Sequence, residues 1–445
     1  MDPYMDLTVE LSQSAILPSA TPQVVYGLVR MMPKGQSSGP RLPLDLRFLL
    51  DRSGSMGSNA ARFDLRSKLD ALQDAVGAVI DQLVPGDRIT VISFDDRTRE
   101  EVPPTLIQSA MDQRRAKMAV EAIRLGGGTH MSGGLRKVIR SDSRTEGSVK
   151  RGIIFTDGEV NSPSEAGEER NCTTLAQEAG QKHFPLTLFG TGVEYNDRFL
   201  EKLARESNGR SEHLEDATQA VSVFMEEVGY LQEVSVMNLE VTLAVVDSSF
   251  TSVSRVVPQI EPQVLCSPNY FSTYLGDVDK VRGQAILFSL HIPPFSQVPL
   301  GGKLLLGRAE VVFDVPSKRL KGARTDQVIE IRVTDDPNQV VVNLPVLTTV
   351  KLEGATKLQT KALDLAQAGN VHQATAMLSQ VATLYQSAGQ EDLATKAMTL
   401  TNALTQNGGI SGDTLNVQRT LTTASKKMIT KRLTTQSDPS AKTVA

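Results

Sequence analysis

Hydroxyl and carboxylate oxygens follow an apolar segment near the start of the chain. The stretch "FLLDRSGSMG" ends with Asp51, and Ser53 and Ser55 come next at alternating positions among glycines. Two later loops offer the same atoms: "GGGTHMSGG" contains Thr129, and "FTDGE" places Asp157 directly after another apolar segment. Three hydroxyls and two carboxylates, without nitrogen or sulfur, favour a hard cation, Mg²⁺ first and Mn²⁺ or Ca²⁺ next.

A site rich in hydroxyls has a chemical consequence for the ion. If the hydroxyls take the direct positions and the aspartates act largely through water, the metal keeps most of its charge. Such an ion seeks one more anionic ligand, and a carboxylate from a partner protein would serve. The glycines in these loops let the backbone come close to the ion.

The elements that must position these loops form an alternating pattern from residue 44 to about 229. The expected strands are "LDLRFLLD", "RITVISF", "RGIIFTDG", "FPLTLFG" and "GRSEHLED", and helices are expected over 64–83, 113–123, up to 140, over 172–183, 197–207 and 217–229. Regular alternation with short connections predicts an α/β fold, a doubly wound and mostly parallel sheet with helices on both faces. Ligands of such sheets bind at the carboxyl ends of the strands, where the three loops would meet.

The flanking segments have a different pattern. Residues 5–30 contain two expected strands, and 234–350 contain strand-like segments separated by proline and glycine turns, which predict an antiparallel β-sandwich or barrel. Two isolated strands are barely stable, so we expect 5–30 to join the later sheet and the α/β domain (44–229) to be inserted into a β domain. Residues 351–433 are expected to form a helical hairpin or arm, and 434–445 a flexible tail.

Composition restricts the function classes. Net charge is −4, tryptophan is absent and there are two cysteines, which argues against nucleic-acid binding, a disulfide framework and a zinc site. The last expected helix, 414–433, carries five basic and no acidic residues, and a solvated basic face is favoured over a membrane or nucleic-acid contact. With no secretory signal and no apolar segment long enough to span a bilayer, a cytoplasmic location is expected.

The three motifs "DRSGSM", "GGGT" and "TDG", in that order on an alternating α/β frame, resemble the von Willebrand factor type A (vWA) domain and its metal-ion-dependent adhesion site. The resemblance covers 44–229 and implies Asp51, Ser53, Ser55, Thr129 and Asp157 as the metal ligands. The flanks are similar to prokaryotic vWA proteins often labelled as related to calcium-activated chloride channels or inter-α-trypsin inhibitor heavy chains. The alternative is a degenerate vWA fold that binds no metal.

Residues near the expected site have two interpretations each. His130, Asp95 and Glu159 are candidates for a partner-binding rim, with Asp96 beside them. The plainer alternatives are a surface histidine, a turn at Asp95 and Asp96, and a solvated loop carboxylate at Glu159. A phosphate loop at the glycines is disfavoured, because no Gly-Lys-Ser/Thr sequence follows them.

The favoured function is a non-enzymatic, metal-dependent protein-binding module. Its partner would offer an Asp or Glu carboxylate, and by resemblance the setting would be an intracellular assembly with an AAA+ ATPase, kinase or phosphatase. A self-assembling scaffold is the alternative. A metal-dependent hydrolase or phosphotransferase is less favoured, because the sequence shows no positioned general base, nucleophile elbow or nucleotide loop. A further hypothesis is that partner binding shifts the helix at 217–229 and so couples to the β domain.

Overall fold

The computed structural model describes residues 3–34, 41–61, 63–141, 147–157, 165–192, 196–258, 267–407, 409 and 411–435. It divides into two compact units, one made of Met1–Ser37 and Ser235–Ala445 and the other of Ser38–Val234. The second unit therefore interrupts the first in sequence. This confirms the predicted insertion of an α/β fold into a β fold followed by helices.

The α/β unit is built on one mixed sheet. Its strand order is β11-β10-β9-β4-β7-β8, with β4 Leu44–Asp51, β7 Arg88–Phe94, β8 Thr98–Leu106, β9 Val149–Thr156, β10 Leu186–Thr191 and β11 Arg210–Leu214. All neighbours are parallel except β7 and β8. The chain adds strands first on one side of β4 and then on the other, so the topological switch point lies between β4 and its neighbours.

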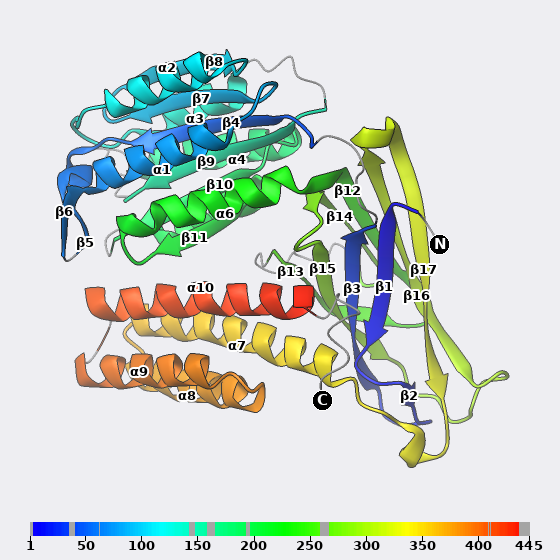
Figure 1. Cartoon of the computed structure of the whole chain (residues 1–445). Coiled ribbons are helices and arrows are strands. Elements are labelled where there is room, and N and C mark those ends of the chain that lie inside the picture. The colour runs from blue at the N-terminus through cyan, green and yellow to red at the C-terminus, as the bar shows by residue number, and fades with distance from the viewer. Residues whose placement is uncertain are drawn as a thin grey trace. The chain divides into compact units, whose positions relative to one another are not determined.

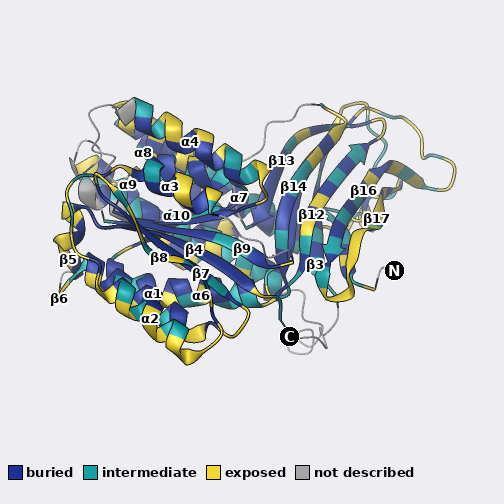
Figure 2. Ribbon diagram, turned by 90° about the horizontal axis from the view of Figure 1, so that it is seen from above, coloured by how far each residue is buried: buried dark blue, intermediate teal, exposed yellow. Residues whose placement is uncertain are grey.

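Helices cover both faces of this sheet. They are α1 Lys68–Gln82, α2 Ala110–Glu121, α3 Met131–Arg140, α4 Glu165–Gln181, α5 Asp197–Glu206 and α6 Ala220–Gln232, with 3₁₀ turns η1 Gly54–Gly57 and η2 Ala217–Gln219. Helix α1 packs against α2 and α6, while α4 packs against α3 and α5 on the opposite face (Figure 1). Figure 2 shows the central strands buried and the covering helices with exposed stripes, and every residue of β4 is buried.

Two local elements differ from the expectation. The helix expected from residue 64 begins at Lys68, because Ser67 and Asp70 form a capping box there. Before it stands a hairpin of β5 Asn59–Ala61 and β6 Asp64–Ser67, and this leaves Leu65 87% exposed instead of on an apolar helix face. Strand β8 was not expected, because it contains two prolines, which an edge strand tolerates.

The β unit is a sandwich of two sheets with the orders β1-β3-β15-β13 and β14-β12-β16-β17-β2. The strands are β1 Met5–Leu11, β2 Ala15–Ile16, β3 Gln23–Pro33, β12 Val234–Val245, β13 Ser249–Val257, β14 Tyr270–Asp279, β15 Gln284–Ile292, β16 Lys303–Val315 and β17 Leu320–Val333, with 3₁₀ turns η3 Pro316–Lys318 and η4 Pro337–Gln339. The N-terminal strands pair within it, and Met31 of β3 lies opposite Gln284 of β15. Residues such as Val29, Phe288 and Phe313 fill the core between the sheets.

The helices after the sandwich are α7 Leu344–Gln367, α8 Val371–Ser387, α9 Glu391–Asn407 and α10 Gly412–Thr435. They form one hydrophobic core with the outer face of the sheet that contains β3 and β15, through Leu28 and Leu287 against residues such as Leu352. The region is thus an array packed on the sandwich, and it begins before residue 351 because Asn343 caps α7. Its basic last helix is only partly solvated, since Arg419 is 5% exposed. The tail was expected over 434–445, but α10 continues through Thr435, and 436–445 lies outside the described residues.

Within the described part of the chain, no helix combines the length and apolarity that a bilayer-spanning segment needs.

Candidate metal centre

Asp51 ends the buried strand β4 at the switch point of the sheet. Its Oδ1 accepts the backbone N–H of Ser53 at 2.8 Å, and its Oδ2 accepts the hydroxyl of Thr156 at 2.7 Å. Burial, and next the negative charge of Asp157, raise the pKa of Asp51 to about 6. A buried carboxylate close to a second carboxylate is an environment that a bound cation relieves.

Ser53, Ser55 and Asp157 form a chain of hydrogen-bonded oxygens. The hydroxyls of Ser53 and Ser55 are 3.0 Å apart, and Ser55 donates to Oδ1 of Asp157 at 2.7 Å. The turn η1 curls the loop after β4, and Asp157 follows the neighbouring strand β9, so two loops deliver these atoms to one place. The structure therefore brings together four of the five predicted ligand residues.

Thr129, the fifth candidate, lies on a loop that is held against the first by backbone hydrogen bonds. Gly54 N–H donates to the carbonyl of Gly127 at 2.9 Å, and Gly126 N–H donates to the carbonyl of Arg52 at 2.7 Å. Thr129 is 6% exposed, and its hydroxyl makes no hydrogen bond with the other four side chains, all of which are described. The structure places it on the adjacent loop, outside the hydrogen-bonded chain.

The glycines before Thr129 are required by two carboxylates that approach them. A Cβ atom on Gly126 would lie 1.9 Å from Oδ2 of Asp95, and one on Gly127 would lie 2.3 Å from Oδ2 of Asp96. The N–H of Gly128 donates to Oδ2 of Asp96 at 3.0 Å. In a phosphate-binding loop the backbone N–H groups bind the phosphate. Here a carboxylate already accepts one of these N–H groups, which argues against a phosphate-binding loop.

Asp95 is a buried support for the glycine loop, and of its two interpretations the structure has the turn, between β7 and β8, and not the exposed rim. It is 7% exposed, and its Oδ2 lies 2.5 Å from Nη2 of Arg52. Burial alone would raise the pKa of Asp95, but the N–H of Arg97 and the guanidinium of Arg52 outweigh burial and hold this pKa below its usual value. Arg52 also donates to the carbonyl of Arg124 at 3.1 Å, so it ties the two loops together. Sequence reasoning missed Arg52, because its position in the motif carries no required residue type.

The other rim candidates have different positions. The His130 side chain is 53% exposed, and its Nε2 lies 3.3 Å from Oε2 of Glu168. Glu168 is buried and accepts the N–H and the hydroxyl of Ser132 in the first turn of α3. His130 therefore lies at the surface beside Thr129, and Glu168 orients it. Glu159 lies outside the described residues.

Lys68 is a second residue that the motifs did not reveal. It is the first residue of α1, and its Nζ donates to Oδ2 of Asp157 at 2.8 Å. Both oxygens of Asp157 thus have partners, Ser55 on one and Lys68 on the other.

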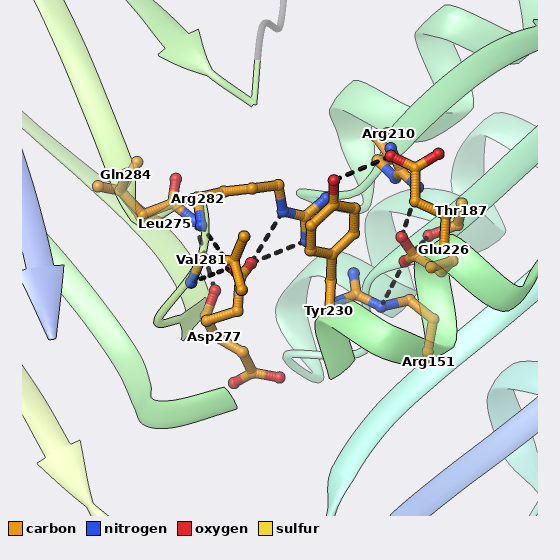
Figure 3. A network of polar contacts seen from close by, with 12 residues as sticks. Arg151, Thr187, Arg210, Glu226, Tyr230, Leu275, Asp277, Val281, Arg282 and Gln284 are labelled. Atoms are coloured by element: carbon orange, nitrogen blue, oxygen red, sulfur yellow. Dashed lines mark hydrogen bonds and ion pairs between the residues drawn. The ribbon is translucent and has the colours of Figure 1, made fainter. Parts of the chain in front are cut away.

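At the amino-terminal ends of the parallel strands, remote from Asp51, a buried ionic cluster contacts α6. Glu227 of α6 accepts the hydroxyl of Thr187 at 2.8 Å, and its carboxylate lies 2.5 Å from Arg210 and 3.6 Å from Arg151. Figure 3 shows Arg151, Thr187 and Arg210, which come from the amino-terminal ends of β9, β10 and β11. Charged contacts therefore hold α6 at the end remote from Asp51, and the shift of this helix on partner binding stays a prediction.

The donor set fits a divalent cation with oxygen ligands. Two carboxylates and a pair of neutral hydroxyls converge, and Ser55 is exposed, so solvent reaches the site. Within the described ranges, no group of three or more His, Cys, Asp or Glu side chains could hold a metal, and the candidate site combines two carboxylates with hydroxyls instead. An ion here would take its protein ligands from the loops of Asp51, Thr129 and Asp157 and would supply positive charge at the rim.

Comparisons with known proteins agree with this architecture. Residues 45–226 match the family model "von Willebrand factor type A domain", and 345–431 match "Sll0103-like, C-terminal alpha-helical domain". The uncharacterized protein sll0103 of Synechocystis sp. is 24% identical over 388 residues, which is 85% of this chain and 87% of that protein. The inter-alpha-trypsin inhibitor heavy chain H4 of Bos taurus is 27% identical over 199 residues, which is 42% of this chain and 20% of the bovine protein.

Solved structures share the fold. A von Willebrand factor type A protein from Catenulispora acidiphila has a TM-score of 0.71 at 20% identity, over 89% of both chains. The ArnB paralog VWA2 from Sulfolobus acidocaldarius has a TM-score of 0.56 at 15% identity, over 95% of this chain and 98% of that chain. Together with the family models, these similarities confirm the resemblance expected from the three motifs. Residues 45–226 of this chain are therefore a von Willebrand factor type A domain, joined in the same polypeptide to an Sll0103-like C-terminal helical domain.

Proposed function

We propose that the vWA domain is a metal-dependent protein-binding module. Mg²⁺, held by Asp51, Ser53, Ser55, Thr129 and Asp157, would accept a carboxylate from an Asp or Glu of the partner. The observation that carries this proposal is the hydrogen-bonded chain from Ser53 through Ser55 to Asp157, beside the buried carboxylate of Asp51. Because the hydroxyl ligands are neutral, the bound ion would keep part of its positive charge. A carboxylate from another protein could then neutralise that charge.

Access supports binding of a large partner. Ser55 and Asp96 are exposed, and the His130 side chain is 53% exposed, so the site opens onto the surface of the domain. The glycine loop is held from below by Arg52 and Asp95, which keeps Thr129 next to the first loop. A preformed, open and oxygen-lined site suits recognition of a side chain on another protein.

Metal binding is tested first, by isothermal titration of the full chain with Mg²⁺ and with Mn²⁺. Wild type is compared with Asp51→Ala and with Asp81→Ala, which removes an exposed carboxylate of α1 that pairs with Lys117 on the surface. We expect one site in wild type and in Asp81→Ala, and its loss in Asp51→Ala. Equal titrations for all three proteins would contradict the proposed site.

Partner binding is tested by affinity capture from a lysate of the source organism. The chain is immobilised in Mg²⁺, in EDTA, and as Thr129→Ala in Mg²⁺. A protein retained only by wild type in Mg²⁺ is then purified, and its surface Asp and Glu residues are replaced one at a time. Loss of binding on one such replacement supports the proposal. If the same proteins are retained under all three conditions, the binding surface is not the metal site.

A further inference from the structure

Lys68 stands at a position that its own helix disfavours. It is the first residue of α1, where the partial positive charge of the helix terminus repels a cation. Its side chain is only 17% exposed, and its ammonium lies 2.8 Å from Oδ2 of Asp157, whose side chain is 4% exposed. The contact with Asp157 therefore compensates for the unfavourable helix position and for partial burial.

The carboxylate of Asp157 faces two ways. Oδ1 accepts the hydroxyl of Ser55, on the side of the candidate ligands, and Oδ2 accepts Lys68. An ion held by Ser53 and Ser55 would meet Oδ1, directly or through water, and would leave the bond to Lys68 in place. A Cβ on Gly192 would lie 3.6 Å from Nζ of Lys68, so the backbone directly after β10 passes close to the ammonium.

The charges at this point can be counted from the contacts. Asp51 and Asp157 supply two negative charges, and a divalent cation would cancel both. Asp95 adds no net charge, because Arg52 pairs with it. Lys68 then leaves one positive charge on the set of the ion, Asp51, Asp157 and Lys68, which a single carboxylate from a partner would cancel. Asp96, beside the glycine loop, adds a negative charge that is the same in wild type and in every Lys68 variant.

We propose that Lys68 is the residue that makes the loaded site select a carboxylate ligand. By sharing Asp157 with the metal, it weakens the attraction of the empty site for the cation and strengthens the attraction of the loaded site for an anion. The inference rests on the proposed function, since it concerns the same metal site. It adds a specificity-determining residue outside the five candidate ligands.

The two affinities must then respond in opposite directions. Replacing Lys68 by methionine keeps the length and the apolar contacts of the side chain but removes its charge. A unit charge within a few ångströms changes the free energy of binding a second charge strongly enough for roughly tenfold effects, even at high effective dielectric constant. We expect Lys68→Met to bind the cation roughly tenfold more tightly and a carboxylate roughly tenfold more weakly.

The experiment uses the full chain, Mn²⁺ as the cation and acetate as the carboxylate. Free Mn²⁺ is measured by electron paramagnetic resonance, which gives the cation affinity. Acetate binding is measured from the loss of water proton relaxation when acetate displaces water from bound Mn²⁺. The variants are Lys68→Met, Lys68→Arg, which retains the charge, and Lys117→Met, which removes a surface lysine that pairs with Asp81.

Tighter Mn²⁺ and weaker acetate in Lys68→Met, with Lys68→Arg and Lys117→Met close to wild type, would support the role of Lys68. A Lys68→Met variant with the affinities of wild type would overturn this role while the metal site itself stands. If wild type and Asp51→Ala both fail to bind Mn²⁺, the proposed function and the inference fall together. Circular dichroism at matched temperature establishes that each variant is folded, and Lys68→Gln replaces Lys68→Met if that variant is not.

Discussion

Nη2 of Arg52 lies 2.5 Å from Oδ2 of Asp95, and this buried ion pair joins the loop after β4 to the loop after β7. Arg52 is 4% exposed, and the same carboxylate group receives the N–H of Gly127 at 3.4 Å. The buried Arg52–Asp95 ion pair therefore supports the loops that carry the solvent-exposed side chains of the candidate metal site.

Removing Arg52 should damage both stability and metal binding. In Arg52→Met the buried Asp95 loses its counterion, and breaking one partner of such a pair costs about 3–5 kcal/mol. The matched control is Arg66→Met, whose guanidinium is 53% exposed and pairs with Asp64 and Asp74 at the surface, where the expected cost is at most about 1 kcal/mol. Urea denaturation and Mg²⁺ titration measure the two effects, and similar losses in both variants would refute this role of Arg52.

The raised pKa of Asp51 predicts a pH dependence of the metal-free protein. A carboxyl whose folded pKa of about 6 exceeds its ordinary value of 3.8 binds more protons in the folded state between these pH values. The free energy of unfolding therefore falls as the pH rises through about 4 to 6, and by pH 7 the loss from Asp51 is about 3 kcal/mol.

Comparison with Asp51→Asn isolates this contribution, because the amide keeps the shape of the side chain but does not titrate in this range. Denaturation is measured in EDTA at intervals from pH 4.5 to 7.5. The difference in unfolding free energy between Asp51→Asn and wild type should grow with pH and level off above about 6. A difference that stays constant across the range would show that Asp51 does not titrate as expected.

Gly126 should not tolerate a side chain, whereas Gly54 should. A Cβ on Gly126 would lie 1.9 Å from Oδ2 of Asp95, but the nearest atom to a Cβ on Gly54 would be the carbonyl oxygen of Gly127 at 3.8 Å. Gly126→Ala must displace Asp95 or the loop that carries Thr129, so we expect Mg²⁺ affinity to fall by about tenfold or more. Gly54→Ala should stay within about threefold of wild type, and an equal loss in both variants would contradict the packing argument.

Glu227 should hold α6 in place. In Glu227→Ala the buried guanidinium of Arg210 loses its nearer carboxylate partner and keeps Glu212 at 3.5 Å, at a cost of about 3 kcal/mol. The neighbour Glu226 is exposed, accepts the hydroxyl of Tyr230, and adds its charge at Arg210 after Glu227 and Glu212, so Glu226→Ala should cost at most about 1 kcal/mol. Hydrogen exchange of the amide groups of α6 measures local opening, which should increase in the first variant and not in the second.

The sequence was informative where the residue type itself has a geometric or chemical meaning. The apolar run before Asp51 predicted β4, and the order of the three loops predicted that Asp51, Ser53, Ser55 and Asp157 would come together. A helix was expected over 197–207, and Asn196 caps it by accepting the N–H of Phe199 at 3.0 Å. These features depend on patterns within single segments of the sequence. They also depend on the rule that the binding loops of a parallel sheet meet at the carboxyl ends of its strands.

Other features depend on contacts between distant residues, which a pattern in one segment does not contain. The helix expected from residue 64 begins at Lys68, since the capping box of Ser67 and Asp70 is stronger than the spacing of Leu65. The burial of Asp95 follows from Arg52, a residue whose partner lies on another loop. Lys68 was missed for the same reason, because only the fold brings it to Asp157.

The pairing of Met31 in β3 with Gln284 in β15 also sets an order of events during synthesis. The ribosome makes the whole α/β unit, Ser38–Val234, before it makes the strand that β3 needs as its neighbour. At translation rates of about 5–20 residues per second, β1 and β3 wait on the order of tens of seconds without the rest of their sheet. The nascent chain thus completes its vWA domain before the sandwich can close, and in that interval its earliest strands are a segment for chaperones to protect.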